Sequence, residues 1–257
     1  MGFLSFRRRR ADTVPDDQLR RLVRRWLAPW PHLAPAERDL LIEYTDTLVH
    51  ELRWETARGF TLTDDMRANV AAHAALLVLA FDDGLASYRD VTSVIVHPTT
   101  IVRTGVHYLG NGLYTDADDP IIGEAFHRGP VMVSWDAAAF QARNPERGEN
   151  VLLHEFAHRL DMLDGLSDGT PPLRDEAAMT EWVRVCSRSL RALRAHEEPS
   201  VLRSYAATNP AEFFAVATEV FFTRPVALRE ENEPLYAVLR DYFGQDPARR
   251  WPQPIRP

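Results

Sequence analysis

The sequence contains no lysine and only one cysteine. All 30 basic residues are arginine, and the 37 acidic residues bring the formal net charge to −7. A chain with this charge is not expected to bind nucleic acid as its main partner, because contact with phosphates requires a basic surface. Cys186 cannot form an internal disulfide, which excludes a disulfide-stapled scaffold. Its helical surroundings predict a small core residue rather than a nucleophile.

Long hydrophobic runs are also missing. No stretch approaches the roughly 18 consecutive apolar residues of a transmembrane helix, so we expect no integral membrane association. Residues 7–10 are all arginine and follow a short apolar stretch. Charges precede the apolar segment in a secretory signal peptide, so the order is wrong for one. We expect a solvated arginine-rich tail and a cytoplasmic protein.

What the sequence does contain is typical of a globular protein. Hydrophobic residues make up 45% of the chain and charged residues 26%, and the length is sufficient to bury a substantial core. Apolar spacing and β-branched runs predict short strands between blocks of helices, and hence a mostly helical α+β fold with a small mixed sheet. The predicted helices are 16–28, 35–50, 66–80, 136–142, 149–163, 174–196, 210–223 and 225–243, and the predicted strands are 91–96, 100–106 and 130–135.

Composition and pattern also divide the chain into four parts. We expect a disordered arginine-rich tail over 1–12 and a helical segment over 13–85. A catalytic core over 86–246 would pack with that segment as one globular unit, and an extended tail would follow over 247–257.

The residues most informative about chemistry are His154, Glu155 and His158, which form a His-Glu-x-x-His motif in a predicted helix. Residues four apart lie on one face of a helix, so the two imidazoles can point at one metal ion. Zinc accepts neutral imidazole nitrogen and prefers four ligands. Glu155 is placed to act as general base on a water activated by the ion. Two histidines bind zinc weakly, so the motif predicts a third protein ligand.

Two sources of this third ligand are open. Asp164 occupies the position that a metzincin would use, but such a site needs a sharp chain turn at a glycine, and Asp161 stands there instead. Glu212 lies on a later helix, as in a gluzincin. Asn209 and Pro210 predict the start of that helix, and Glu212 could also be only a capping-box residue.

We favour Glu212 because the apolar residues around it predict a buried helix, where a carboxylate needs a partner. Glu219 lies seven residues later on nearly the same face and could be a ligand or a residue that supports one. Asp161 could accept the N–H of a ligand imidazole, or it could be exposed to solvent. The phenol of Tyr205 could stabilise an oxyanion near the metal.

The strand over 130–135 could pair with an extended peptide if it lies at an edge of the sheet beside the zinc helix, or it could be a plain core strand.

At these positions the chain resembles the titration factor A (MtfA-like) family of bacterial zinc peptidases. The resemblance covers about residues 15 to 245, with N-terminal helices, a short strand region and then the zinc helix in the same order. The matching stretches are 129–135, 150–161 and 205–215.

This resemblance implies a zincin-like core of the gluzincin type, similar to the catalytic domain of lethal-factor-type toxins. It implies that His154, His158 and Glu212 hold one zinc ion, that Glu155 is the general base and that Tyr205 stabilises the transition state. Family members are described as cytosolic aminopeptidases acting on peptides, and as proteins that bind the transcriptional repressor Mlc. The alternative function is therefore a regulatory protein that sequesters a repressor, with peptidase activity secondary.

Overall fold

The structure is a computed structural model that describes residues 16–250, except 58, 100, 104–106, 111–112, 116–118, 122, 126–128 and 196–199. Between residues 101 and 125 it describes only the backbone of short strands. The predicted tail over 1–12 lies outside the described residues. Within the part of the chain that is described, no helix combines the length and the apolar character needed to cross a membrane.

Three helices form the N-terminal part, in the ranges that the apolar spacing predicts. They are α1 (Asp16–Trp26), α2 (Pro35–Glu51) and α3 (Asp64–Leu77). The third begins where the Thr63 hydroxyl accepts the backbone N–H of Met66, a side-chain cap for an otherwise unpaired donor. Helix α3 is rich in alanine and buried along most of its length, so it can pack closely against helices from the rest of the chain.

The sheet contains four strands in the order β1-β2-β8-β7. Strands β1 (Arg53–Thr56), β2 (Ser93–His97) and β8 (Val131–Ser134) run parallel, and β7 (Gly123–Ala125) is antiparallel to β8. Strand β1 lies between two predicted helices in the segment expected to be helical, and the sequence did not predict it. Its four residues alternate between exposed and half-buried, and an edge strand this short carries almost no apolar pattern.

The strand over 130–135 forms as predicted, but it is not an edge strand. Strand β2 pairs with one side of β8 and β7 pairs with the other. Of the two alternatives open for β8, an edge that pairs with a peptide and a plain core strand, the structure supports the core strand, because a backbone hydrogen-bonding edge is available only where no neighbouring strand occupies it. Among the described residues, β7 is the last strand on this side of the sheet.

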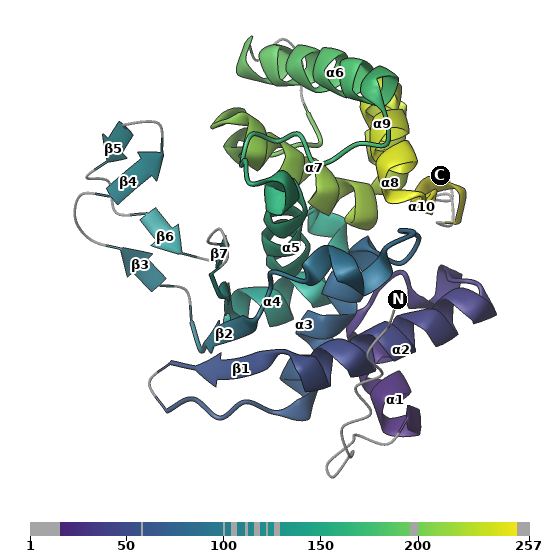
Figure 1. Ribbon diagram of the computed structural model, residues 1–257, viewed down its shortest axis with the longest axis vertical. Coiled ribbons are helices and arrows are strands. Elements are labelled where there is room, and N and C mark those ends of the chain that lie inside the picture. Colours follow the sequence, from purple (N-terminus) through teal and green to yellow (C-terminus); the bar gives the residue numbers. More distant parts are fainter. Residues whose placement is uncertain are drawn as a thin grey trace, which may run out of the picture.

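Between β2 and β8 the chain forms short antiparallel pairs beside the main sheet (Figure 1). Strand β3 (Ile101–Arg103) pairs with β6 (Asp119–Ile121), and β4 (His107–Gly110) pairs with β5 (Leu113–Thr115). Only the first of these four strands was predicted. The Gly- and Asp-rich composition of this region indicates turns, and the strands described here have only three or four residues each.

After β8 the described chain is helical. The α-helices are α4 (Trp135–Arg143), α5 (Val151–Asp161), α6 (Glu176–Ala195), α7 (Pro210–Thr223), α8 (Pro225–Glu231), α9 (Glu233–Phe243) and α10 (Pro247–Arg250). Short 3-10 turns connect several elements: Trp30–His32, Gly84–Tyr88, Pro145–Arg147, η4 (Met162–Asp164) and η5 (Ser204–Ala207).

Two predictions in this part need correction. The single helix predicted over 225–243 is interrupted at Asn232, whose side chain accepts the N–H of Leu235 and caps α9. Residues 247–250 were predicted to be extended but form the short helix α10, fixed by an ion pair of 2.6 Å between the Arg250 guanidinium and the Glu37 carboxylate.

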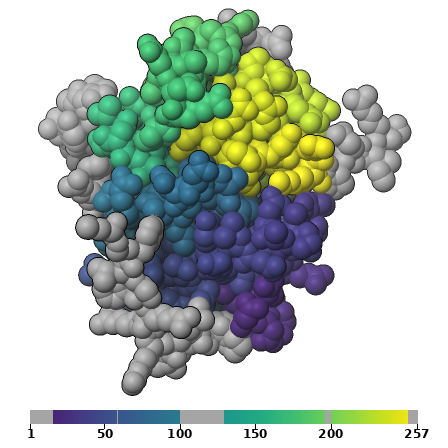
Figure 2. All heavy atoms as spheres, turned by 45° about the vertical axis from the view of Figure 1, so that its right-hand side comes forward, coloured from purple at the N-terminus to yellow at the C-terminus, as the bar shows by residue number. Residues whose placement is uncertain are grey.

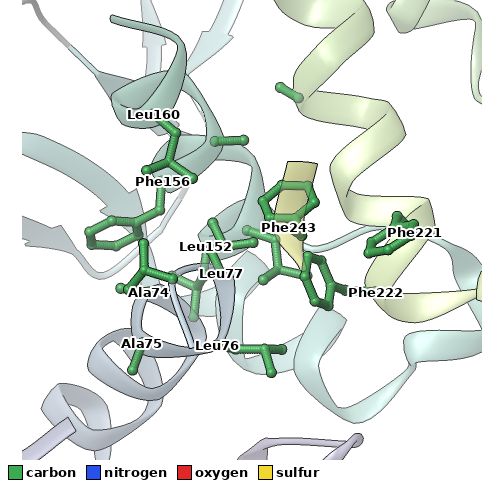
Figure 3. Close-up of a cluster of buried hydrophobic side chains, with 14 of the residues drawn as sticks. Ala74, Ala75, Leu76, Leu77, Leu152, Phe156, Leu160, Phe221, Phe222 and Phe243 are labelled. Atoms are coloured by element: carbon green, nitrogen blue, oxygen red, sulfur yellow. The ribbon is translucent and has the colours of Figure 1, made fainter. Parts of the chain in front are cut away.

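One hydrophobic cluster extends from the N-terminal helices to the C-terminal ones. Figure 3 shows leucines of α3, side chains of α5 and phenylalanines of α7 and α9 converging. In Figure 2 the purple and blue N-terminal region lies directly against the green and yellow C-terminal region. Helix α5 lies between α3 and α7 (Figure 1), so the helix that carries the His-Glu-x-x-His motif is held from two sides.

Candidate metal centre

The first half of the site is built on α5. Asn150 caps this helix, with its side-chain oxygen 3.1 Å from the N of Leu152 and 3.2 Å from the N of Leu153. One turn later His154 and His158 lie above one another on the same face. Their Nε2 atoms are 3.2 Å apart, and both side chains are buried. The cap and the packing of α5 therefore aim two imidazole nitrogens at one point.

The second half of the site is the first turn of α7. Asn209 caps this helix by accepting the backbone N–H of Glu212 at 2.9 Å, so the cap is made without the Glu212 carboxylate. That carboxylate turns toward α5 instead. Its Oε2 lies 3.0 Å from Nε2 of His154, and its Oε1 lies 3.6 Å from Nε2 of His158. The structure thus brings together the three residues that the sequence predicted as ligands.

The spacing of these atoms fits one small cation. Two ligand atoms that are each about 2.0–2.1 Å from a tetrahedral zinc ion lie about 3.3 Å apart, and the three separations here range from 3.0 to 3.6 Å. Oε2 of Glu212 is buried and makes no hydrogen bond within the described chain, although His154 is so close. A buried carboxylate oxygen in this position is well suited to bind a metal ion.

The pKa values of the clustered side chains also indicate that the cluster suits a cation. Burial lowers the pKa of His154, but the carboxylates of Glu212 and Glu219 outweigh burial and raise this pKa to about 10. Burial likewise opposes ionisation of Glu212, yet contact with His154 and His158 holds its pKa well below the usual range. The ligand set therefore attracts a positive charge, which is a proton on His154 unless a metal ion replaces it.

Glu219 contacts His154 at Nδ1, the ring nitrogen that does not face Glu212. Its Oε1 lies 2.7 Å from Nδ1 of His154, and its side chain is 1% exposed. Because a carboxylate can only accept at this distance, Nδ1 carries a hydrogen, and Nε2 is the nitrogen that would bind a metal ion once its own proton is displaced. Of the two roles that the sequence left open for Glu219, the structure supports that of a supporting residue.

Two other acids that the sequence brought into consideration lie outside the cluster. Two alternatives were open for Asp161, accepting an imidazole N–H or exposure to solvent, and both are wrong: Asp161 is buried, and its Oδ2 accepts the backbone N–H of Gly169 at 3.0 Å. Burial raises the pKa of Asp161 to about 7. Asp164, the metzincin-like alternative, is exposed and accepts the backbone N–H of Leu166. Among the described residues, the group of side chains that could hold a metal ion does not include Asp164.

The two predicted catalytic residues flank the cluster. Glu155 follows His154 on α5 and is 2% exposed. Tyr205 lies in η5, with its ring centroid 6.1 Å from that of His154. Its side chain is 49% exposed, so this ring borders the cluster on a side that solvent can reach.

The sequence analysis missed two features that position the site. Arg203 makes an ion pair with Glu219, with one guanidinium nitrogen 2.7 Å from Oε1. A buried glutamate requires a cationic partner, but the pattern alone does not identify which of 30 arginines supplies it. Gly169 has φ +76, and a Cβ atom there would lie 2.2 Å from the carbonyl oxygen of Pro210. Its close approach fixes the beginning of α7 beside the loop that follows α5.

Comparisons with known proteins agree with this site. The family model described as glucose-regulated metallopeptidase M90 matches residues 3–244. An uncharacterized protein of Synechocystis is 31% identical over 85% of this chain and 80% of its own length. Mlc titration factor A of Serratia proteamaculans is 29% identical over 87% of this chain and 89% of its own length. The protein of that name from Pectobacterium atrosepticum is 29% identical over 86% and 84%. With His154, His158 and Glu212 gathered as a metal-binding group, the chain belongs to the M90 family of glucose-regulated metallopeptidases.

Proposed function

We propose that this protein is a zinc-dependent aminopeptidase. The observation that carries the proposal is the convergence of two imidazole nitrogens and one carboxylate, with separations of 3.0 to 3.6 Å, next to a buried glutamate. Nitrogen and carboxylate donors in this number are typical of catalytic zinc sites, which leave a position open for water or substrate. The preference for a free N-terminus rests on the resemblance to titration factor A proteins.

The reaction is hydrolysis of a peptide bond. When bound, the zinc ion supplies Lewis-acid chemistry, polarising the carbonyl and lowering the pKa of water toward about 7. Glu155 takes a proton from the attacking water on its carboxylate and transfers it to the nitrogen of the leaving amine. The Tyr205 hydroxyl donates a hydrogen bond to the oxyanion that forms at the former carbonyl. Glu219 keeps His154 in the tautomer that the ion requires.

Substitution of Glu155 tests the chemistry. Glu155→Gln keeps the size of the side chain but removes the base, so we expect zinc to stay bound while turnover falls by at least about 100-fold. Glu230→Gln, at an exposed position on α8, is the matched control and should retain full activity. Full activity in Glu155→Gln would exclude its assignment as general base.

The substrate class is tested with two sets of peptides, each with and without a chelator. Aminoacyl fluorogenic substrates report removal of an N-terminal residue, and internally quenched peptides with a blocked N-terminus report internal cleavage. An aminopeptidase should act on the first set and not on the second. Cleavage of the blocked peptides at a comparable rate would replace this proposal with an endopeptidase.

Binding of a repressor is the second candidate function. Its support is that relatives covering most of this chain are named Mlc titration factor A, and such a role would require the cytoplasm, where the sequence led us to expect this protein. Sequestration needs no general base. A pull-down of an Mlc-type repressor by Glu155→Gln should therefore succeed if binding is the main function, and absence of binding by the wild type would exclude it.

A further inference from the structure

The carboxylate of Glu219 is the point where three parts of the site meet. Oε1 accepts hydrogen bonds from Nδ1 of His154 and from Nη2 of Arg203, both at 2.7 Å. Oε2 accepts from the backbone N of Asn150 at 2.6 Å and from Nη1 of Arg203 at 2.9 Å. All four donors are within hydrogen-bonding distance of a side chain that is 1% exposed. Because α7 carries Glu219, Asn150 caps α5 and α5 carries His154, this carboxylate connects the two helices that hold the candidate metal ligands.

Arg203 supplies half of these hydrogen bonds. Its planar guanidinium approaches both carboxylate oxygens in parallel, which fixes the orientation of the carboxylate as well as its position. Without Arg203 the carboxylate would keep one hydrogen bond on each oxygen, from Nδ1 of His154 and from the backbone N–H of Asn150, but this buried anion would lose its cationic partner. The two arginine contacts therefore stabilise the orientation in which Oε1 lies 2.7 Å from Nδ1 of His154 and the imidazole directs Nε2 at Glu212.

The same arginine also contacts the segment that carries Tyr205. Arg203 immediately precedes η5, and its guanidinium carbon lies 5.7 Å from the centroid of the Tyr205 ring. This is the distance range of a cation–π contact. The centroid of the Tyr205 ring also lies 6.1 Å from that of His154. Arg203 therefore contacts both Glu219, which orients His154, and the phenol ring of Tyr205, which lies beside His154.

We propose that Arg203 is a positioning residue that aligns His154 for the metal ion and Tyr205 for the substrate at the same time. It acts through Glu219 in the first case and through the phenol ring in the second, and it touches neither ion nor substrate. This inference rests on the proposed zinc peptidase function. It predicts that loss of Arg203 weakens metal binding, and that the remaining metal-loaded enzyme is slow because Tyr205 is displaced.

The test compares three variants of the full chain. Arg203→Met removes the charge and both hydrogen bonds but keeps much of the apolar stem, whereas Arg203→Lys keeps the charge and cannot form the two-pronged contact. Arg184→Met is the matched control, because Arg184 makes a similar two-nitrogen contact with Glu181 on an exposed face of α6. Zinc affinity is measured by competition with a chromophoric chelator. The kcat and KM are then measured at saturating zinc.

We expect Arg203→Met to bind zinc about 10 to 100 times more weakly than the wild type, as is typical when a residue supporting a metal ligand is lost. At saturating zinc its kcat should fall while KM changes little. The zinc affinity and kcat of Arg203→Lys should lie between those of Arg203→Met and the wild type. Those of Arg184→Met should equal the wild-type values. If Arg203→Met does not fold, the Lys variant alone decides by the same two measurements.

Zinc affinity and kcat within twofold of the wild type, in whichever Arg203 variant folds, would overturn the proposal. A wild-type protein that binds no zinc or cleaves no peptide would instead refute the proposed function itself.

Discussion

Replacing Gly169 by alanine tests how the beginning of α7, and with it Glu212, is held in place. Gly169 is buried between α5 and α7. Its N–H donates to Asp161, and its carbonyl oxygen accepts the indole N–H of Trp182 at 2.9 Å. Its φ is +76, and a Cβ atom would lie 2.2 Å from the carbonyl oxygen of Pro210. Alanine at this position should therefore lower the free energy of unfolding for two separate reasons, the left-handed backbone conformation and the clash with Pro210.

Gly59→Ala is a control for the effect of backbone conformation alone. Its φ of +71 is nearly the same, but an added Cβ would meet no atom within 4 Å. The left-handed conformation costs an alanine about 1–2 kcal/mol at either position. Relief of the clash requires the start of α7 or the loop to move by roughly 1 Å, at a cost of about 1–3 kcal/mol for overpacking. This second cost falls on Gly169→Ala alone.

The free energies of unfolding of the two variants should therefore differ by about 1–3 kcal/mol, or about 2 to 12 °C in Tm for a chain of this size. Thermal unfolding followed by circular dichroism in the presence of a chelator measures this difference. Gly169→Ala should also bind zinc more weakly, because the backbone that moves lies two residues before Glu212. Equal Tm values for the two variants, with unchanged zinc affinity, would show that Gly169 does not position α7.

Two further predictions concern protons. Since the pKa of His154 is raised to about 10 in the absence of an ion, zinc must displace a proton, and the apparent zinc affinity should rise about tenfold per pH unit between about pH 7 and 9. Chelator competition at three pH values measures this slope, and a flat profile would contradict it. Asp161 has a pKa raised by burial from 3.8 to about 7, so the unfolded chain loses this proton first and stability should decrease as the pH rises between these values. Asp161→Asn should remove that decrease in urea unfolding measured at pH 5 and pH 8, and an unchanged pH dependence would refute the assignment.

The sequence predicted the helices best where the apolar pattern is long. Helices α1, α2 and α7 begin at their predicted residues, because Asp16, Pro35 and Asn209–Pro210 mark each start. It failed at short elements. Strand β1 has four residues and exists because β2 lies beside it, and that partner is nearly 40 residues away in the chain.

In the candidate site, too, the sequence predicted the residues that follow from a local pattern and missed those that depend on tertiary packing. His154 and His158 follow from helical spacing alone, and the apolar residues around Glu212 gave a local reason to consider it. The partner of His154 depends on how α5 packs against α7, which spacing does not reveal. Asp161 and Glu219 were both on plausible faces, and only tertiary packing assigned the contact with Nδ1 of His154 to Glu219. Arg203 could not be identified because its role is defined by contacts with residues distant in the sequence.

X-ray diffraction from zinc-soaked crystals, recorded on both sides of the zinc absorption edge, tests the central claim most directly. We predict one anomalous peak per chain, about 2.0–2.1 Å from Nε2 of His154, Nε2 of His158 and a carboxylate oxygen of Glu212. A peak bound by Asp164 in place of Glu212, or no peak between α5 and α7 at saturating zinc, would contradict the account.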